Sequence, residues 1–89
     1  MPKAEISWKR VTEEGVKLQV YAQHVGSEWK FFHREKRFDP WQAVPEPPLE
    51  DWLELLDAMQ RLVVRRRYQP DDEEDVRQKI RVRFPDADV

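Results

Sequence analysis

Residues 5–36 read EISWKRVTEEGVKLQVYAQHVGSEWKFFHREK, and this stretch decides the fold class. Apolar and polar residues alternate over 16–23 and, less regularly, over 29–36, which is typical of half-buried strands. Glu13-Glu14-Gly15 suits a three-residue hairpin loop, and Gly26-Ser27 suits a two-residue type II′ turn. We therefore predict a three-stranded antiparallel meander over residues 1–36.

The two loop lengths also fix the strand register, because a hairpin loop sets which residues face each other. The predicted cross-strand pairs are Ile6 with Ala22, Trp8 with Val20, Val20 with His33, and Tyr21 with Phe32. One face of the sheet is then apolar and is formed by Ile6, Trp8, Val16, Leu18, Val20, Ala22, Trp29 and Phe31. The opposite, basic-aromatic face is formed by Lys9, Lys17, Gln19, Tyr21, Gln23, Lys30, Phe32, Arg34 and Lys36.

The second half of the chain predicts helices after a connector. Residues 37–48 hold four of the seven prolines, so we interpret them as an extended connector, with Phe38 and Trp41 at the margin of the core. From 48 to 67 the apolar period is helical, with Pro48 at the first position and acidic residues on the polar side of the helix: Glu50, Asp51, Glu54 and Asp57. We expect this helix to lie across the apolar face of the sheet.

The segment 71–84 has two interpretations. Asp71 and Glu74 have the spacing of a capping box, and an acidic start with a basic end suits a helix dipole. Residues 80–84, however, alternate like a strand. The fold class we predict is α+β, a β-β-β-α-α chain in which the second helix is the shorter one, with a strand over 76–84 as the alternative.

The apolar stripe of the first helix covers about 200° of its circumference, about twice what a surface helix needs. A second contact must therefore bury Leu55, Met59 and Leu62. The last segment supplies that contact if it is helical. If it is a strand, these three residues form a protein-contact patch, and a homodimer is expected.

Composition limits the class of protein. The 89 residues predict a single small domain, and the absence of Cys excludes disulfide scaffolds and thiolate sites. Sixteen basic and 18 acidic residues give a net charge of −2, so no global charge imbalance favours nucleic acid or anionic membrane. No apolar run suggests a leader or a membrane span, and we expect a cytoplasmic protein.

Catalytic and cofactor sites are not indicated. Ser7 lies on the opposite face of the predicted sheet from His24 and His33, so no serine triad forms. The two histidines are separated by about 13 Å along the strands, too far to share a metal ion. No Gly-rich phosphate loop is present. We predict neither an enzyme, nor a cofactor, nor a small-molecule ligand.

The best functional signal is the basic-aromatic face. Its candidate nucleic-acid-binding residues are Lys9, Tyr21, Lys30, Phe32 and Arg34, because open sheets bind single strands with aromatic platforms ringed by cations. The same pattern is also that of an ordinary solvated face or of a protein-docking surface. A second basic group comprises Arg61, Arg65, Arg66 and Arg67, which we expect the acids of 71–75 to neutralise. We favour a non-catalytic interaction module that binds a second copy of itself or an unidentified protein. Nucleic-acid binding is the alternative.

Overall fold

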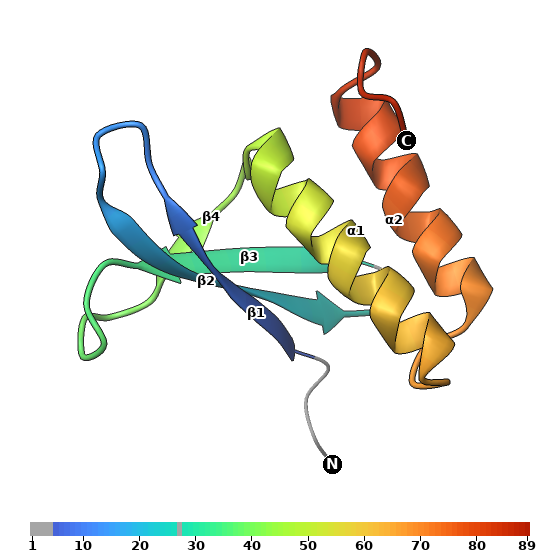
Figure 1. Ribbon diagram of the computed structural model, residues 1–89, viewed down its shortest axis with the longest axis horizontal. Coiled ribbons are helices and arrows are strands. Elements are labelled where there is room, and N and C mark those ends of the chain that lie inside the picture. The colour runs from blue at the N-terminus through green and yellow to red at the C-terminus, as the bar shows by residue number, and fades with distance from the viewer. Residues whose placement is uncertain (1–4, 27) are drawn as a thin grey trace. The chain divides into compact units, whose positions relative to one another are not determined.

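The computed structural model describes residues 5–26 and 28–89, and its elements follow the predicted order (Figure 1). They are β1 (Glu5–Val11), β2 (Lys17–Val25), β3 (Glu28–Arg34), β4 (Gln42–Val44), α1 (Leu49–Val64) and α2 (Pro70–Arg83). An antiparallel sheet followed by two helices is the predicted α+β fold, with one short strand more than expected. The chain divides into two compact units, Met1–Pro47 and Pro48–Val89.

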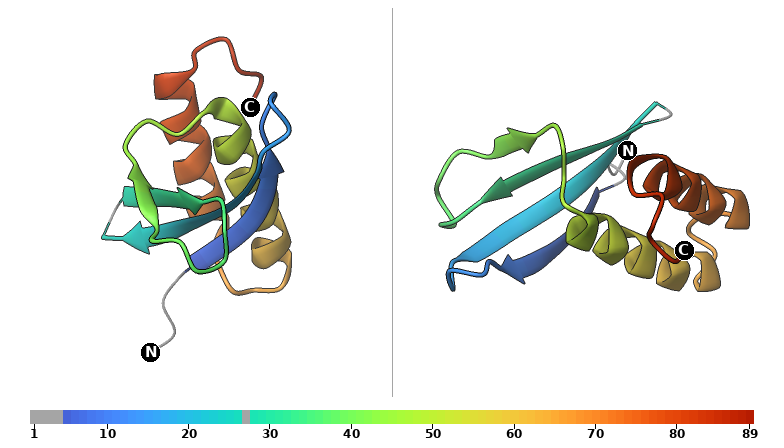
Figure 2. Two further views of the ribbon diagram at one scale, coloured as in Figure 1. Left: turned by 90° about the vertical axis from the view of Figure 1, so that its left-hand side faces the viewer. Right: turned by 90° about the horizontal axis from the view of Figure 1, so that it is seen from above.

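The sheet has the strand order β1-β2-β3-β4, and each strand runs antiparallel to its neighbour (Figure 2). The predicted register is confirmed at every pair named above: Ile6 with Ala22, Trp8 with Val20, Val20 with His33, and Tyr21 with Phe32. Gly15 has a φ of 84°, and its N–H donates to the Thr12 carbonyl at 2.9 Å. Gly26 has a φ of 61°, so it too takes the left-handed conformation that a primed turn requires; Ser27 lies outside the described residues.

The two faces of the sheet differ as the alternation predicts. Most residues of the apolar face are buried, namely Ile6, Leu18, Val20, Ala22, Trp29 and Phe31, whereas Trp8 and Val16 are partly exposed. Lys36, which we assigned to the basic-aromatic face, instead lies in the loop after β3, since that strand ends at Arg34.

The Pro-rich connector contains a strand that the sequence analysis missed. Residues Gln42–Val44 form β4, in which Val44 pairs with Phe31 and Gln42 with His33. Between β3 and β4 the chain makes a tight loop in which the Asp39 N–H donates to the Lys36 carbonyl at 3.0 Å. The prediction that Phe38 lies at the core margin is wrong, because its side chain is 91% exposed in this loop.

The helical unit begins with α1, which has Pro48 at its N-cap. Five of its apolar residues are buried, namely Trp52, Leu55, Leu56, Ala58 and Met59. The expectation that its acidic residues all lie on the polar side is wrong for Asp51, which is fully buried. The apolar arc is not covered everywhere, because Val64 remains 82% exposed at the end of the helix.

The last segment is a helix, so its strand alternative is wrong. Helix α2 packs side by side with α1, and the two run in opposite directions (Figure 1). Its buried residues are Val76 and Ile80, whereas Val82, a member of the alternating run, is 77% exposed. Within the described residues, no helix combines the length and the apolarity that a bilayer crossing requires.

The start of α2 is two residues earlier than the predicted capping box. The Gln69 N–H donates to Asp72 Oδ2 at 2.8 Å, and Pro70 occupies the first helical position. Asp71 and Glu74 therefore do not cap the helix. A Pro at the first position needs no N–H partner, which favours this start.

Candidate functional site

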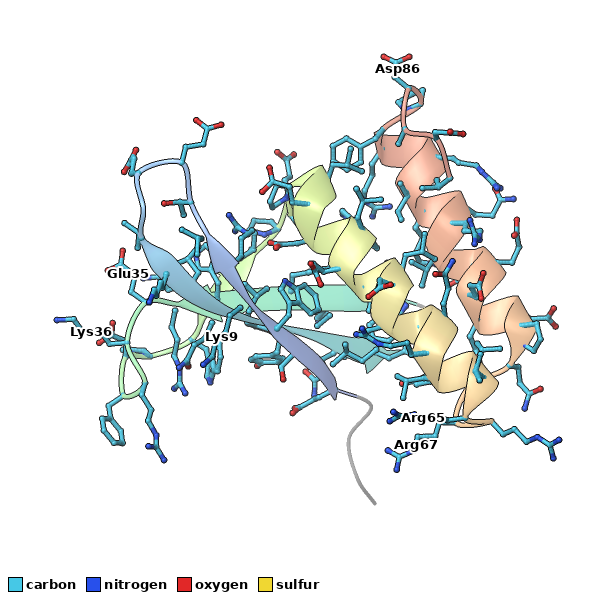
Figure 3. The ribbon with its side chains drawn as sticks, in the orientation of Figure 1. Lys9, Glu35, Lys36, Arg65, Arg67 and Asp86 are labelled. Carbon is cyan, nitrogen blue, oxygen red and sulfur yellow. The ribbon has the colours of Figure 1, made fainter. Side chains whose placement is uncertain are left out.

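The candidate site is the basic-aromatic face of the sheet, where the register brings the five predicted residues together in adjacent rows. Tyr21 and Phe32 face each other in the middle row. Lys9, Gln19 and Arg34 form the row on one side, and the row on the other side is Glu5, Gln23 and Lys30, so it holds one acid as well as a cation. Side chains two residues apart on a strand share one face, so the aromatic pair has cations on both sides. In Figure 3, Lys9 extends from the strand β1.

The aromatic pair is part of a larger cluster. The rings of Tyr21 and Phe32 stack with centroids 4.8 Å apart and planes inclined by 20°. Trp41, from the connector, meets the Tyr21 ring edge to face at a centroid distance of 4.6 Å. The prediction that Trp41 lies at the core margin is therefore wrong: it belongs to the basic-aromatic face and is 38% exposed.

Arg34 is held in place by three contacts. Its guanidinium carbon lies 4.1 Å from the centroid of the Trp41 ring. Its Nε donates to Gln19 Oε1 at 2.8 Å, and its Nη1 donates to the Asp39 carbonyl at 3.3 Å. Such contacts remove most of the freedom of a long side chain, so Arg34 is oriented in the unbound protein.

An open hollow of about 530 Å³ lies beside the aromatic cluster. The residues that line it are Glu5, Ser7, Trp8, Lys9, Gln19, Val20, Tyr21 and Trp41. Burial raises the pKa of Tyr21 above its ordinary 10.0, and the nearby Glu5 carboxylate adds to this effect. The phenol therefore stays protonated at neutral pH and is available as a hydrogen-bond donor at the hollow.

The ring geometry limits what the face can bind. A nucleobase stacks on the free face of an aromatic ring. Tyr21 and Phe32 turn one face toward each other, Trp41 makes an edge-to-face contact with Tyr21, and Arg34 covers a face of Trp41. The members of the cluster thus cover much of one another's ring surface. The cluster resembles a preformed docking surface more than a stacking platform.

The cations that flank the cluster are open to a partner. Lys9 and Lys30 are exposed, and neither forms an ion pair with a carboxylate among residues 5–26 and 28–89. A lysine ammonium in water gains most from a negatively charged partner group. The face therefore suits a partner that carries acidic groups.

The structure buries most of the predicted protein-contact patch. Leu55 and Met59 are fully buried, and Leu62 is partly buried. Leu55 and Met59 thus have no side-chain surface to offer a second chain. We expected the last segment to bury these residues if it is helical, and it is helical. Under that interpretation no second protomer is needed to bury Leu55 and Met59.

In the described part of the chain, no three His, Asp or Glu side chains are grouped so that they could hold a metal ion. Compared with known protein families, with curated proteins and with solved structures, the chain matches none of them.

Proposed function

We propose that this chain is a non-catalytic protein-interaction module that docks an acidic segment of another protein on its basic-aromatic face. The observation that carries the proposal is the ordered cluster of Tyr21, Phe32, Trp41 and Arg34. Trp41, together with Gln19 and Asp39, holds the Arg34 guanidinium in place. Tyr, Trp and Arg are the residue types that dominate binding energy at protein interfaces. A cluster that is rigid before binding loses little side-chain entropy when a partner docks.

Charge supports the acidic character of the partner. The exposed ammonium groups of Lys9 and Lys30 flank the cluster, and carboxylates on a docked segment would approach both. The hollow between Tyr21, Trp41 and Lys9 offers room for one apolar side chain beside these charges. An acidic peptide with interspersed apolar residues is therefore the matching ligand class.

Nucleic-acid binding by this face is the alternative, and it has weaker support. The cations are suitable for phosphates, but the ring faces that bases would use are in large part occupied. Base stacking is limited to the ring faces that the Tyr21–Phe32 stack and the contacts of Trp41 leave free.

The test is a titration of the isotope-labelled protein, followed by NMR, with a peptide that alternates Glu and Leu. We expect shifts of the Trp41 indole and of amides in β2 and β3, and no shifts with the matching Lys and Leu peptide. Trp41→Ala should weaken binding about thirty-fold, since loss of an interface anchor costs about 2 kcal/mol or more and each 1.4 kcal/mol is tenfold. Phe38→Ala is the matched control, because Phe38 is exposed but outside the cluster, and it should bind normally.

Two outcomes would overturn the proposal. The first is an acidic peptide that shifts amides outside this face or binds Trp41→Ala as well as the natural chain. The second is a mixed-sequence single strand that shifts the Trp41 indole while the acidic peptide does not, which would establish the nucleic-acid alternative instead. Lys30→Gln, an exposed substitution that spares the fold, should weaken peptide binding and reduce its salt dependence.

A further inference from the structure

A second basic surface lies at the end of α1, in the turn formed by Arg65, Arg66 and Arg67, which we name the arginine turn. The Arg66 N–H donates to the Val63 carbonyl at 2.9 Å, and the Arg67 N–H donates to the Leu62 carbonyl, also at 2.9 Å. This pair of hydrogen bonds is the Schellman motif that ends many helices. It requires the left-handed conformation at its central residue, and Arg66 has a φ of 62°.

Arginine is an unfavourable choice for that conformation. Glycine adopts it without strain, and Asn and Asp tolerate it, whereas a long side chain with a Cβ is penalised. Among the described non-glycine residues, Arg66 alone has a positive φ. Backbone strain of this kind is often retained at binding sites, and the Arg66 side chain is exposed.

The expected neutralisation of this cluster by the acids of 71–75 does not occur. Four of these acids are engaged at the start of α2 or along it: Asp72 with the Gln69 N–H, Glu73 with Arg77, Glu74 with Arg81, and Asp75 with Lys79. Within the described part of the chain, the three arginines of the turn form no ion pair with any carboxylate. Arg61, one turn earlier in α1, pairs with Asp57 at 3.0 Å and is not part of the group.

We propose that the arginine turn binds the phosphate backbone of nucleic acid without reading its sequence. The side chains of Arg65 and Arg67 extend to the same side at the end of the helical unit (Figure 3). A polymer with closely and regularly spaced phosphates offers several anionic groups to the three successive exposed arginines. An acidic protein segment would have to order several flexible carboxylates to match the same spacing, which makes it the poorer partner.

This inference is independent of the proposed docking role of the sheet, because it concerns other residues and another ligand. The turn has no aromatic side chain among its three residues, so the binding is expected to be electrostatic and similar for single strands and duplexes.

The test is fluorescence anisotropy of labelled mixed-sequence DNA, single-stranded and duplex, titrated with the full chain over a series of salt concentrations. Three neutralised phosphates predict a log–log salt slope of about −2.1 for the single strand and about −2.7 for the duplex. Arg66→Gly removes one guanidinium and relieves the backbone, so it should bind several-fold more weakly and reduce the slope by about 0.7–0.9 without loss of helix. Arg37→Gly is the charge-matched control, since it removes an exposed arginine from the sheet unit, and it should leave the slope unchanged.

Several results would overturn the inference. These are no binding at low salt, an unchanged slope for Arg66→Gly, or an equal loss of slope for Arg37→Gly. Equal or tighter binding of polyglutamate, measured by its displacement of the labelled DNA, would assign the turn to acidic proteins instead. The relieved strain of Arg66→Gly offsets much of what the lost charge and the added chain entropy cost, so its stability should stay close to that of the natural chain. Circular dichroism of this variant at the assay temperature then separates weaker binding from unfolding.

Discussion

Replacement of Arg66 by glycine should relieve backbone strain in the helical unit. The residue sits at the left-handed position of the turn that ends α1, with a φ of 62°. An L-residue with a side chain pays about 1–2 kcal/mol for this conformation, whereas glycine pays nothing there. Glycine gains more freedom on unfolding, and this offsets about 0.5–1 kcal/mol of the benefit.

The backbone effect must be separated from the loss of charge. A cation near the C-terminal end of a helix contributes about 0.3–1 kcal/mol, and any neutral replacement of Arg66 loses it. Arg66→Ala loses the same charge but keeps the strain. The difference between the Gly and Ala variants therefore isolates the backbone effect, and we expect the glycine variant to be more stable by about 0.5–1 kcal/mol.

The measurement is urea denaturation of the natural chain and both variants, followed by far-ultraviolet circular dichroism. For a chain of this size, 1 kcal/mol corresponds to about 4–8 °C in Tm, so thermal denaturation gives a second readout. An alanine variant as stable as the glycine variant would show that Arg66 carries no backbone strain. It would also remove the argument that the guanidinium is present for binding.

Three further results are expected. Asp72→Ala should lower stability by about 0.5–1 kcal/mol in urea denaturation, because it removes the acceptor of the Gln69 N–H, and Asp72→Asn should lose less. A hydrogen bond from Arg81 holds the pKa of Glu74 below its ordinary 4.5, so this contribution to stability is complete above that pH and is lost as the pH falls through the lowered pKa. NMR titration of the Glu74 carboxyl checks the direction, and a pKa at or above 4.5 would contradict it. Gly15→Ala should cost about 1 kcal/mol from its φ of 84° alone, because an added Cβ meets no atom within 4 Å, and a cost near zero would contradict that strain.

The meander and its register could be predicted because they depend on local features. A hairpin loop of known length fixes which residues face each other, and alternation then fixes the face of every side chain. For this reason Tyr21 and Phe32 are found opposite each other as predicted. The same alternation predicts that Lys9, Lys30 and Arg34 lie on the face that carries this pair.

The missed features depend on contacts between distant parts of the chain. Strand β4 has only three residues and lies among prolines, so it has no pattern of its own and exists through its pairing with β3. The position of Trp41 follows from that pairing. In the sequence, Trp41 directly follows Pro40 and precedes an extended run, which suggests an extended backbone. This position does not indicate which face of the sheet the Trp41 side chain joins. The angles between the rings of Tyr21, Phe32 and Trp41 are not encoded in alternation at all.

In the helical unit, too, the elements could be predicted but their ends could not. The periodicity of 48–67 predicted α1, and the acidic start and basic end of the last segment favoured α2 over a strand. The ends were less predictable, because Gln69 caps through its backbone N–H and Arg66 takes the place of a glycine. Neither residue type is a usual signal for those roles.

The unequal lengths of the outermost strands limit how copies of this sheet could join. Strand β4 is three residues long and is bracketed by Pro40 and Pro45, which lack the N–H that a neighbouring strand would need. At most the β1 side can accept an additional strand. Fibrils that grow by edge pairing need two accepting sides on every copy. Association through the backbone would therefore end at a pair joined β1 to β1, which protects this chain from amyloid-like polymerisation in its folded state.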